Sequence, residues 1–199
     1  MRIPIMLPHE LVHTLYSHAD PEVLMSVEGM NPGSQAHLQS AKTELGVADL
    51  LGLAVWGDGV PCNFDRTESL ECFCLSLPGL PAAFKTFRVP LAAITKKFVI
   101  KGDTFDDILS IVQWSLEACA LGVFPARRHD GAVFRRSDKQ RAKQALKPLG
   151  CSAVLVEVRG DWQFYKTCFG LPGWRENAGC CWRCRARSLA VAVAVAVVV

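Results

Sequence analysis

The chain has 199 residues, half of them hydrophobic, and a net charge of +3. This length predicts one domain, or one domain with a small appendage, and the hydrophobic fraction allows a sizeable core, which excludes global disorder. The mild net charge does not by itself indicate an acidic or a basic partner.

The first predicted helix, 8–19, has HELVH near its start. In zinc metalloproteases two histidines one turn apart hold the metal and the glutamate polarises the attacking water. A zinc protease site at His9, Glu10 and His13 is therefore one hypothesis. It needs a third ligand, and His18 lies one residue short of the last position of HExxHxxGxxH, a helical rotation of about 100°. We favour the alternative, an amphipathic helix with exposed histidines.

Further along, the apolar pattern predicts a second helix and then a series of strands. The second helix covers 35–46, and apolar runs predict strands at 50–56, 69–77, 89–100 and 151–158. The first strand is expected to end in a tight turn at Gly57-Asp58-Gly59, and the third is expected to break near Thr95. A helix between Asp103 and Gly122 separates the third and fourth strands. This order predicts an α/β fold with a mixed sheet flanked by helices.

We divide the chain into four parts. They are an N-terminal helical segment (1–48), an α/β core (49–170) with a basic insertion (126–147), a cysteine-rich knuckle (171–188) and an Ala/Val tail (189–199). The tail has eleven apolar residues, whereas a membrane helix needs about 20, so we expect no membrane partner and interpret the tail as an artefact or as disordered. The N-terminus lacks the pattern of a secretory signal, which predicts an intracellular protein, nuclear or cytoplasmic, that is not secreted.

Two aspartates next to glycines suggest chemistry. Asp58 and Asp161 each follow an apolar run, in WGDGVP and VRGDW. Carboxylates on neighbouring strands can share a pair of Mg²⁺ or Mn²⁺ ions about 4 Å apart, which clamp the attacking and leaving oxygens of a phosphodiester. A third acid is required, and Glu117 or Glu176 could supply it. The alternative is that each Asp caps a turn or a helix, and that Glu117 belongs to a solvated helix face.

The basic insertion has eight basic and two acidic residues, a net charge of +6. We predict that Arg127, Arg128, Arg135 and Arg136 contact nucleic-acid phosphates, and that changing them to alanine weakens binding and flattens its salt dependence. A solvated loop is the alternative. Only Phe134 offers an aromatic ring for stacking on bases.

The nine cysteines indicate thiols or metal ligands rather than disulfides, because no export signal is seen. Cys181 and Cys184 form a CxxC pair that can bind one Zn²⁺, and Cys180 and Cys168 could complete its four ligands. Buried or free thiols are the alternative. No small-molecule cofactor is evident from the sequence, and the oligomeric state is open.

Several stretches together resemble a large, multicopy, transposon-derived protein family of unicellular algae. They are PHELVHTLYSHADPE, WGDGVPC, VPLAAITKKFVIKGDTFDDILSIVQWSLEACALGVFP and VEVRGDWQFYKTCFGLPGWRENAGCCWRCRA. The resemblance covers residues 8–187, and its most specific part is the GDW…CCWRC block. That family is similar to cut-and-paste transposases with an RNase H-like core and a cysteine-rich knuckle.

The resemblance implies an RNase H-like (DDE) nuclease core, DNA as the partner, Asp58 and Asp161 as ligands of Mg²⁺ or Mn²⁺, and the knuckle cysteines as zinc ligands. The chain departs from the pattern because the third acid is missing or displaced and because the chain stops where such a domain would continue. We therefore expect an incomplete, truncated transposase-like nuclease domain that is inactive as it stands. The alternative is a non-enzymatic, zinc-dependent nucleic-acid or protein-binding module.

Overall fold

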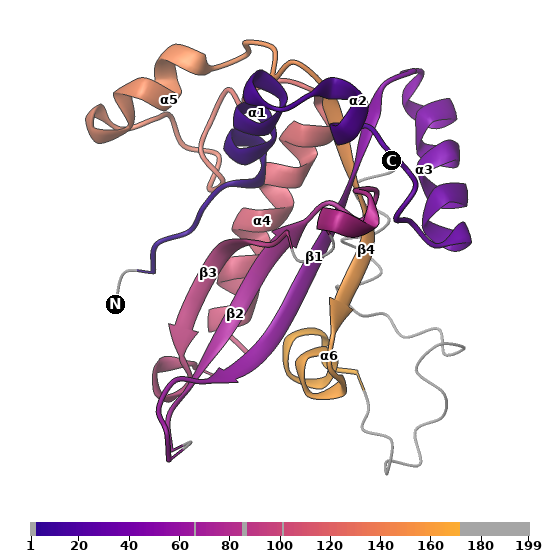
Figure 1. Ribbon diagram of the computed structural model, residues 1–199. Coiled ribbons are helices and arrows are strands. Elements are labelled where there is room, and N and C mark those ends of the chain that lie inside the picture. The colour runs from indigo at the N-terminus through magenta and orange to yellow at the C-terminus, as the bar shows by residue number, and fades with distance from the viewer. Residues whose placement is uncertain (1–2, 66, 85–86, 101, 172–199) are drawn as a thin grey trace.

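The computed structural model describes residues 3–65, 67–84, 87–100 and 102–171 (Figure 1). Its elements are α1 (Pro8–His18), α2 (Pro21–Leu24), α3 (Pro32–Leu45), β1 (Leu50–Pro61), β2 (Ser69–Ser76), β3 (Val89–Thr95), α4 (Thr104–Leu121), α5 (Lys139–Gln144), β4 (Ser152–Gly160) and α6 (Trp162–Phe169). Three short 3-10 helices, η1 (Ala82–Phe84), η2 (Lys96–Phe98) and η3 (Arg136–Asp138), lie between them.

The four strands form one mixed sheet in the order β3-β2-β1-β4. β1, β2 and β3 form an antiparallel meander, and β4 pairs with β1 in parallel. Helix α4 connects β3 to β4, as a parallel return to the sheet requires. The predicted α/β class with a mixed, helix-flanked sheet is confirmed, and so is the end of the third strand at Thr95.

The predicted turn at Gly57-Asp58-Gly59 is wrong. β1 continues through these residues to Pro61, and Asp58 pairs with Cys72 of β2. The glycines do not turn the chain here. Gly57 lies against the ring of Phe164, which a Cβ at this position would overlap. The glycine is needed for close packing of α6 on the strand, a second common reason for glycine within a strand.

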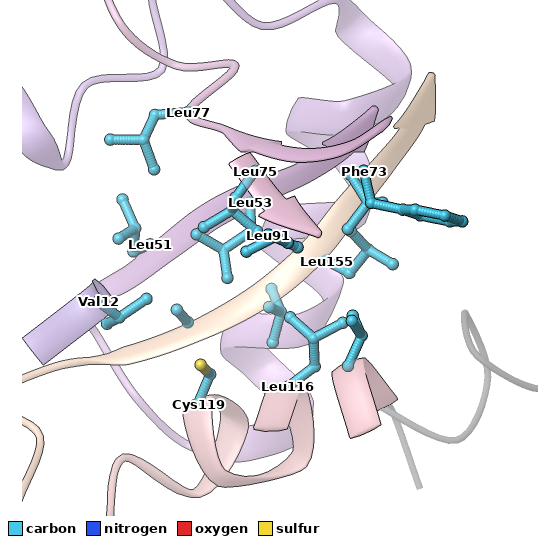
Figure 2. Close-up of a cluster of buried hydrophobic side chains, with 14 of the residues drawn as sticks. Val12, Leu51, Leu53, Phe73, Leu75, Leu77, Leu91, Leu116, Cys119 and Leu155 are labelled. Carbon is cyan, nitrogen blue, oxygen red and sulfur yellow. The ribbon is translucent and has the colours of Figure 1, made fainter. Parts of the chain in front are cut away.

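One part of the core lies between the sheet and α4, on what we call the α4 face (Figure 2), and another part lies under α3, where Met30, Leu38 and Ala41 are buried. Its side chains come from every layer of the fold, including Val12 of α1, Leu53 of β1, Leu75 of β2, Leu91 of β3, Leu116 and Cys119 of α4, and Leu155 of β4. The predicted helix from Asp103 to Gly122 is confirmed, and Gly122 ends it with the positive φ of 67° that a helix C-terminus favours.

The opposite side of the sheet, the α3 face, is covered by α3 over the first half of β1. Asn31 caps α3, and a Cβ on Gly52 would overlap Met30 just before this helix. Glu157 of β4 fixes the contact, because its Oε1 accepts hydrogen bonds from Ser34 Oγ (2.6 Å) and Asn31 Nδ2 (2.9 Å). None of the helices in the described ranges is both long and apolar enough to cross a membrane.

Candidate functional site at the ends of β1 and β4

The register of β1 and β4 brings the two predicted aspartates to one edge of the sheet. Gly57 pairs with Gly160, and a Cβ on either glycine would overlap the ring of Phe164. Both glycines therefore face α6. Asp58 follows Gly57 within β1, so its side chain leaves the backbone on the opposite face of the sheet. Asp161 lies just beyond the end of β4, and its side chain turns toward the first turn of α6. Strands β1 and β4 are neighbours, as a shared metal site at these residues requires.

The two carboxylates differ in their surroundings. Asp161 is exposed and caps α6, because its Oδ1 accepts the backbone N–H of Phe164 at 2.6 Å. The capping interpretation is thus confirmed for Asp161, and its Oδ2 remains available. Asp58 is half-buried and has no hydrogen bond or ion pair with any residue that the structure describes. An ion at this edge would find one carboxylate without a protein partner and one partly engaged.

The structure does not bring Glu117 to this edge. Phe105 at the start of α4 contacts Phe73, with ring centroids 5.8 Å apart, and Phe73 pairs with Gly57. Glu117 lies twelve residues further along α4, about 18 Å at 1.5 Å per residue. It also belongs to the α4 side of the sheet. Its side chain is exposed and accepts a hydrogen bond from Gln113 (3.1 Å), as expected for a solvated helix face.

Two basic side chains that sequence reasoning missed lie on the same face of the sheet as Asp58. Arg159 pairs with Trp56 across β4 and β1, so both side chains share the face of Asp58. The guanidinium of Arg88, just before β3, lies 4.3 Å from the centre of the Trp56 ring. No spacing in the sequence connects these residues, because strand pairing alone brings them together.

The acid pair provides few ligands of its own. Within the described ranges there is no group of three or more His, Cys, Asp or Glu side chains that could hold a metal ion. Mg²⁺, however, is commonly held by one or two carboxylates together with water and phosphate oxygens of the substrate. A site at Asp58 and Asp161 would need that mode of binding, because it has too few protein ligands for a cage built from protein alone.

His9 of the HELVH sequence is part of the core, so the prediction of exposed histidines is wrong. Its side chain is 2% exposed and packs edge-on against Trp114 and Phe124. Ser115 Oγ accepts its backbone N–H (3.0 Å) and lies 2.7 Å from its Nδ1. Burial lowers the pKa of His9 to about 4, so the ring is neutral at pH 7. Helix α1 turns this face toward α4, and the buried polar ring is hydrogen-bonded there.

Glu10 and His13 are also bound to other parts of the chain. Arg141 of α5 donates Nε–H to Glu10 Oε1 (2.6 Å) and a second hydrogen bond to Oε2 (3.2 Å). His13 is half-buried and donates from Nδ1 to the carbonyl oxygen of Leu149 (2.9 Å). A cavity of about 210 Å³ lies between α1 and α5, and His9, Glu10 and His13 are among its lining residues. The glutamate that would polarise water is thus paired with an arginine.

The predicted nucleic-acid contacts of the basic insertion fall into two groups. Arg128 pairs with Asp130 (3.0 Å), and Arg127 donates to the carbonyl oxygen of Gly131 (3.2 Å). Arg135 and Arg136 are exposed, and neither side chain has an acidic partner in the part of the chain that the structure describes. These two keep their charge available to a ligand.

Of the predicted zinc ligands, only Cys168 lies within the described residues. It is buried in α6, and burial raises the pKa of its thiol to about 12, with the charges of Glu71 and Asp161 adding to the effect. Cys180, Cys181 and Cys184 lie outside the described residues, as does Glu176. The zinc site therefore stays a prediction.

Comparison of the chain with protein-family models, with curated proteins and with solved structures finds no match in any of the three.

Proposed function

We propose that the chain is an RNase H-like, transposase-derived domain that binds DNA through a divalent cation held by Asp58 and Asp161, and that it does not cut DNA efficiently. The observation that carries the proposal is the pairing of Gly57 with Gly160 in neighbouring parallel strands. This pairing supports the proposal because Asp58 and Asp161 each directly follow one of the two paired glycines, at the same end of the sheet.

The proposed chemistry follows from the ligands at this edge. A Mg²⁺ or Mn²⁺ ion bound to two carboxylates keeps open positions for water and for phosphate oxygens, so it can bridge the domain to a DNA strand. Cleavage needs more, because in two-metal sites the ions stabilise both the attacking and the leaving oxygen. Glu117 lies too far along α4 to add a ligand. We therefore assign binding to this edge, with weak cleavage at most.

The basic insertion supports the same function. Arg135 and Arg136 are exposed and lack acidic partners among the described residues, and Lys139 and Lys143 follow them on α5. Such side chains neutralise phosphates and release counterions, which gives an affinity that does not depend on sequence and falls with salt. They would add a metal-independent part to the binding of DNA.

The experiment is a titration of the full chain with a fluorescent single-stranded or duplex DNA, followed by anisotropy, in EDTA and in Mn²⁺. We expect Mn²⁺ to tighten binding by about tenfold, equivalent to about 1.4 kcal/mol. Asp58→Asn and Asp161→Asn should remove this gain and leave binding in EDTA unchanged. Asparagine can still cap α6, so the second variant tests the charge and not the fold.

The control variant is Glu117→Gln, which we expect to retain the full effect of Mn²⁺. Equal binding in EDTA and Mn²⁺ would refute the proposed metal site. Efficient Mn²⁺-dependent cleavage that Glu117→Gln abolishes would show instead that a three-acid nuclease site assembles. A binding loss in Arg135→Ala/Arg136→Ala that is the same in both buffers would assign the metal-independent part to the basic insertion.

A further inference from the structure

Another cavity opens on the α3 face at Trp56, two residues before Asp58 on β1. It has a volume of about 240 Å³ and lies between β1, the end of β4 and the chain that follows β2. Its lining includes Trp56, Ser76, Phe87, Arg88 and Arg159. The cavity thus combines two guanidinium groups with two aromatic rings, a composition absent from the apolar cavity near His9.

Arg88 is preorganised to bind an anion. Its guanidinium stacks on Trp56 at 4.3 Å, and in the described residues it has no carboxylate partner. A stacked guanidinium loses little freedom when it binds, and its planar donors match the oxygens of a phosphate. The positive charge of Arg88 acts on Cys74, where it opposes the rise in pKa that burial causes.

Arg159 adds a second set of donors from the facing strand. It forms an ion pair with Glu157, whose carboxylate also accepts hydrogen bonds from Ser34 and Asn31. Glu157 is therefore anchored on α3 and holds Arg159 in place from one side. The guanidinium remains partly exposed, with its side chain 45% accessible, and its other donors can reach a ligand.

We infer that this cavity binds a phosphate monoester carried by a nucleotide, with Arg88 and Arg159 on the phosphate and the base stacked against the Arg88 plane or the Phe87 ring. Bases stack both on aromatic rings and on guanidinium planes. The volume lies below the roughly 300–1,000 Å³ of sites for larger ligands, which limits the occupant to about one nucleotide. The phosphate could come from a free mononucleotide or from the end of a DNA strand.

The inference deepens the proposed function and rests on it only for the DNA source, because Asp58 lies two residues after Trp56 on the same face. A strand end in this cavity would place its next phosphate toward Asp58. Binding of a mononucleotide needs no metal, so it can be measured separately from the Mn²⁺ effect.

The test is calorimetric titration of the full chain in EDTA with adenosine 5′-monophosphate, adenosine and inorganic phosphate. We expect the monophosphate to bind at least about tenfold more tightly than either part alone. A 5′-phosphorylated oligonucleotide that competes with it, while the same oligonucleotide without the phosphate does not, would identify the strand end as a source. Competition by neither oligonucleotide would leave free mononucleotides as the ligand.

Arg88→Ala and Trp56→Leu should each weaken binding of the monophosphate about tenfold or more. Arg88→Lys keeps the charge without the planar donors, so we expect it also to lower the affinity for the monophosphate. This milder variant replaces Arg88→Ala if the alanine variant does not fold. Lys96→Ala, at an exposed basic side chain elsewhere, is the matched control and should bind normally. Equal affinity for phosphate and the monophosphate, or normal binding by folded Arg88 variants, would overturn the inference.

Because these titrations contain EDTA, they do not depend on a metal at the aspartates. Nucleotide binding without any Mn²⁺ effect on DNA would refute the proposed metal site and keep this cavity. A Mn²⁺ effect on DNA binding without nucleotide binding would support the proposed metal site and refute the nucleotide cavity.

Discussion

The two ends of the sheet hold the two sets of candidate catalytic or metal-binding residues, and the two sets differ in whether their polar atoms have partners within the chain. At the end where α1 and α5 lie, His9, Glu10 and His13 are all bound to other parts of the chain (Figure 1). At the end next to α6, Asp58 has no partner among the described residues, and Asp161 uses one oxygen to cap a helix.

The difference teaches that a short motif is a weak guide until its polar atoms are accounted for. HELVH has the spacing of a metal site, yet its glutamate pairs with Arg141 and its first histidine lies in the core. The aspartates have no recognised spacing, and their neighbourhood depends on a pairing between strands about a hundred residues apart. A polar atom without a partner is therefore a better reason to propose a site than a motif whose polar atoms are already engaged.

The largest expected effect is on stability at the α1 end. His9→Ala removes a buried ring and leaves Ser115 Oγ without its side-chain partner, so we expect the free energy of unfolding to fall by about 3 kcal/mol. Urea denaturation followed by circular dichroism measures this change. His18→Ala, at an exposed position of the same helix, is the control and should change stability by less than about 0.5 kcal/mol. A similar small loss for His9→Ala would mean that the ring is not part of the core.

The second expected effect is a dependence of the free energy of unfolding on pH, which comes from the His9 ring. The pKa of His9 is lowered by burial from 6.5 to about 4, so between these values the unfolded chain binds the proton and the folded chain does not. Stability is therefore complete above pH 6.5 and falls as the pH drops toward 4, by up to about 3 kcal/mol.

Thermal and urea unfolding at several pH values between 4 and 7 measure this slope. His9→Asn should flatten it relative to the wild-type chain, even though the variant is less stable at every pH. His18→Asn should keep the wild-type slope. If the slopes of His9→Asn and the wild type coincide, other groups cause the acid sensitivity.

Sequence reasoning could predict the fold more fully than the site. Apolar runs locate the four strands because burial imposes their pattern, and Gly122 marks the end of α4 because a helix C-terminus favours a positive φ. The end of β1 was placed too early because Gly57 has two possible roles, to turn the chain or to admit a neighbour, and only tertiary packing against Phe164 decides between them.

The site depends still more on tertiary structure. Pairing β1 with β4 brings the glycines before Asp58 and Asp161 together, which the order of elements could suggest. The same pairing places Arg159 opposite Trp56, which no local sequence pattern predicts. The reach of Glu117 depends on the direction of α4 along the sheet, and the burial of His9 depends on the packing of α1 against α4. Each of these facts belongs to the assembled fold and not to any single segment.

The smallest expected effect compares one acid from each end of the sheet. Glu10 forms an ion pair with Arg141 whose side chains are 36% and 44% exposed, so the pair is worth less than about 1 kcal/mol and weakens with salt. Glu10→Gln should lower the free energy of unfolding by that amount, and adding Arg141→Ala to it should cost little more. Asp58→Asn should change stability by less than about 0.5 kcal/mol, because no described residue depends on its charge.

Urea denaturation at low and high salt measures both variants. The contrast between the two acids is confirmed if Glu10→Gln lowers stability only at low salt, while Asp58→Asn leaves stability unchanged and removes the Mn²⁺ effect on DNA binding. The contrast is wrong if Asp58→Asn is the more destabilising of the two variants. Asp58 would then be a structural residue like Glu10, and a carboxylate that the fold needs for its own stability would be a poor candidate for a metal ligand.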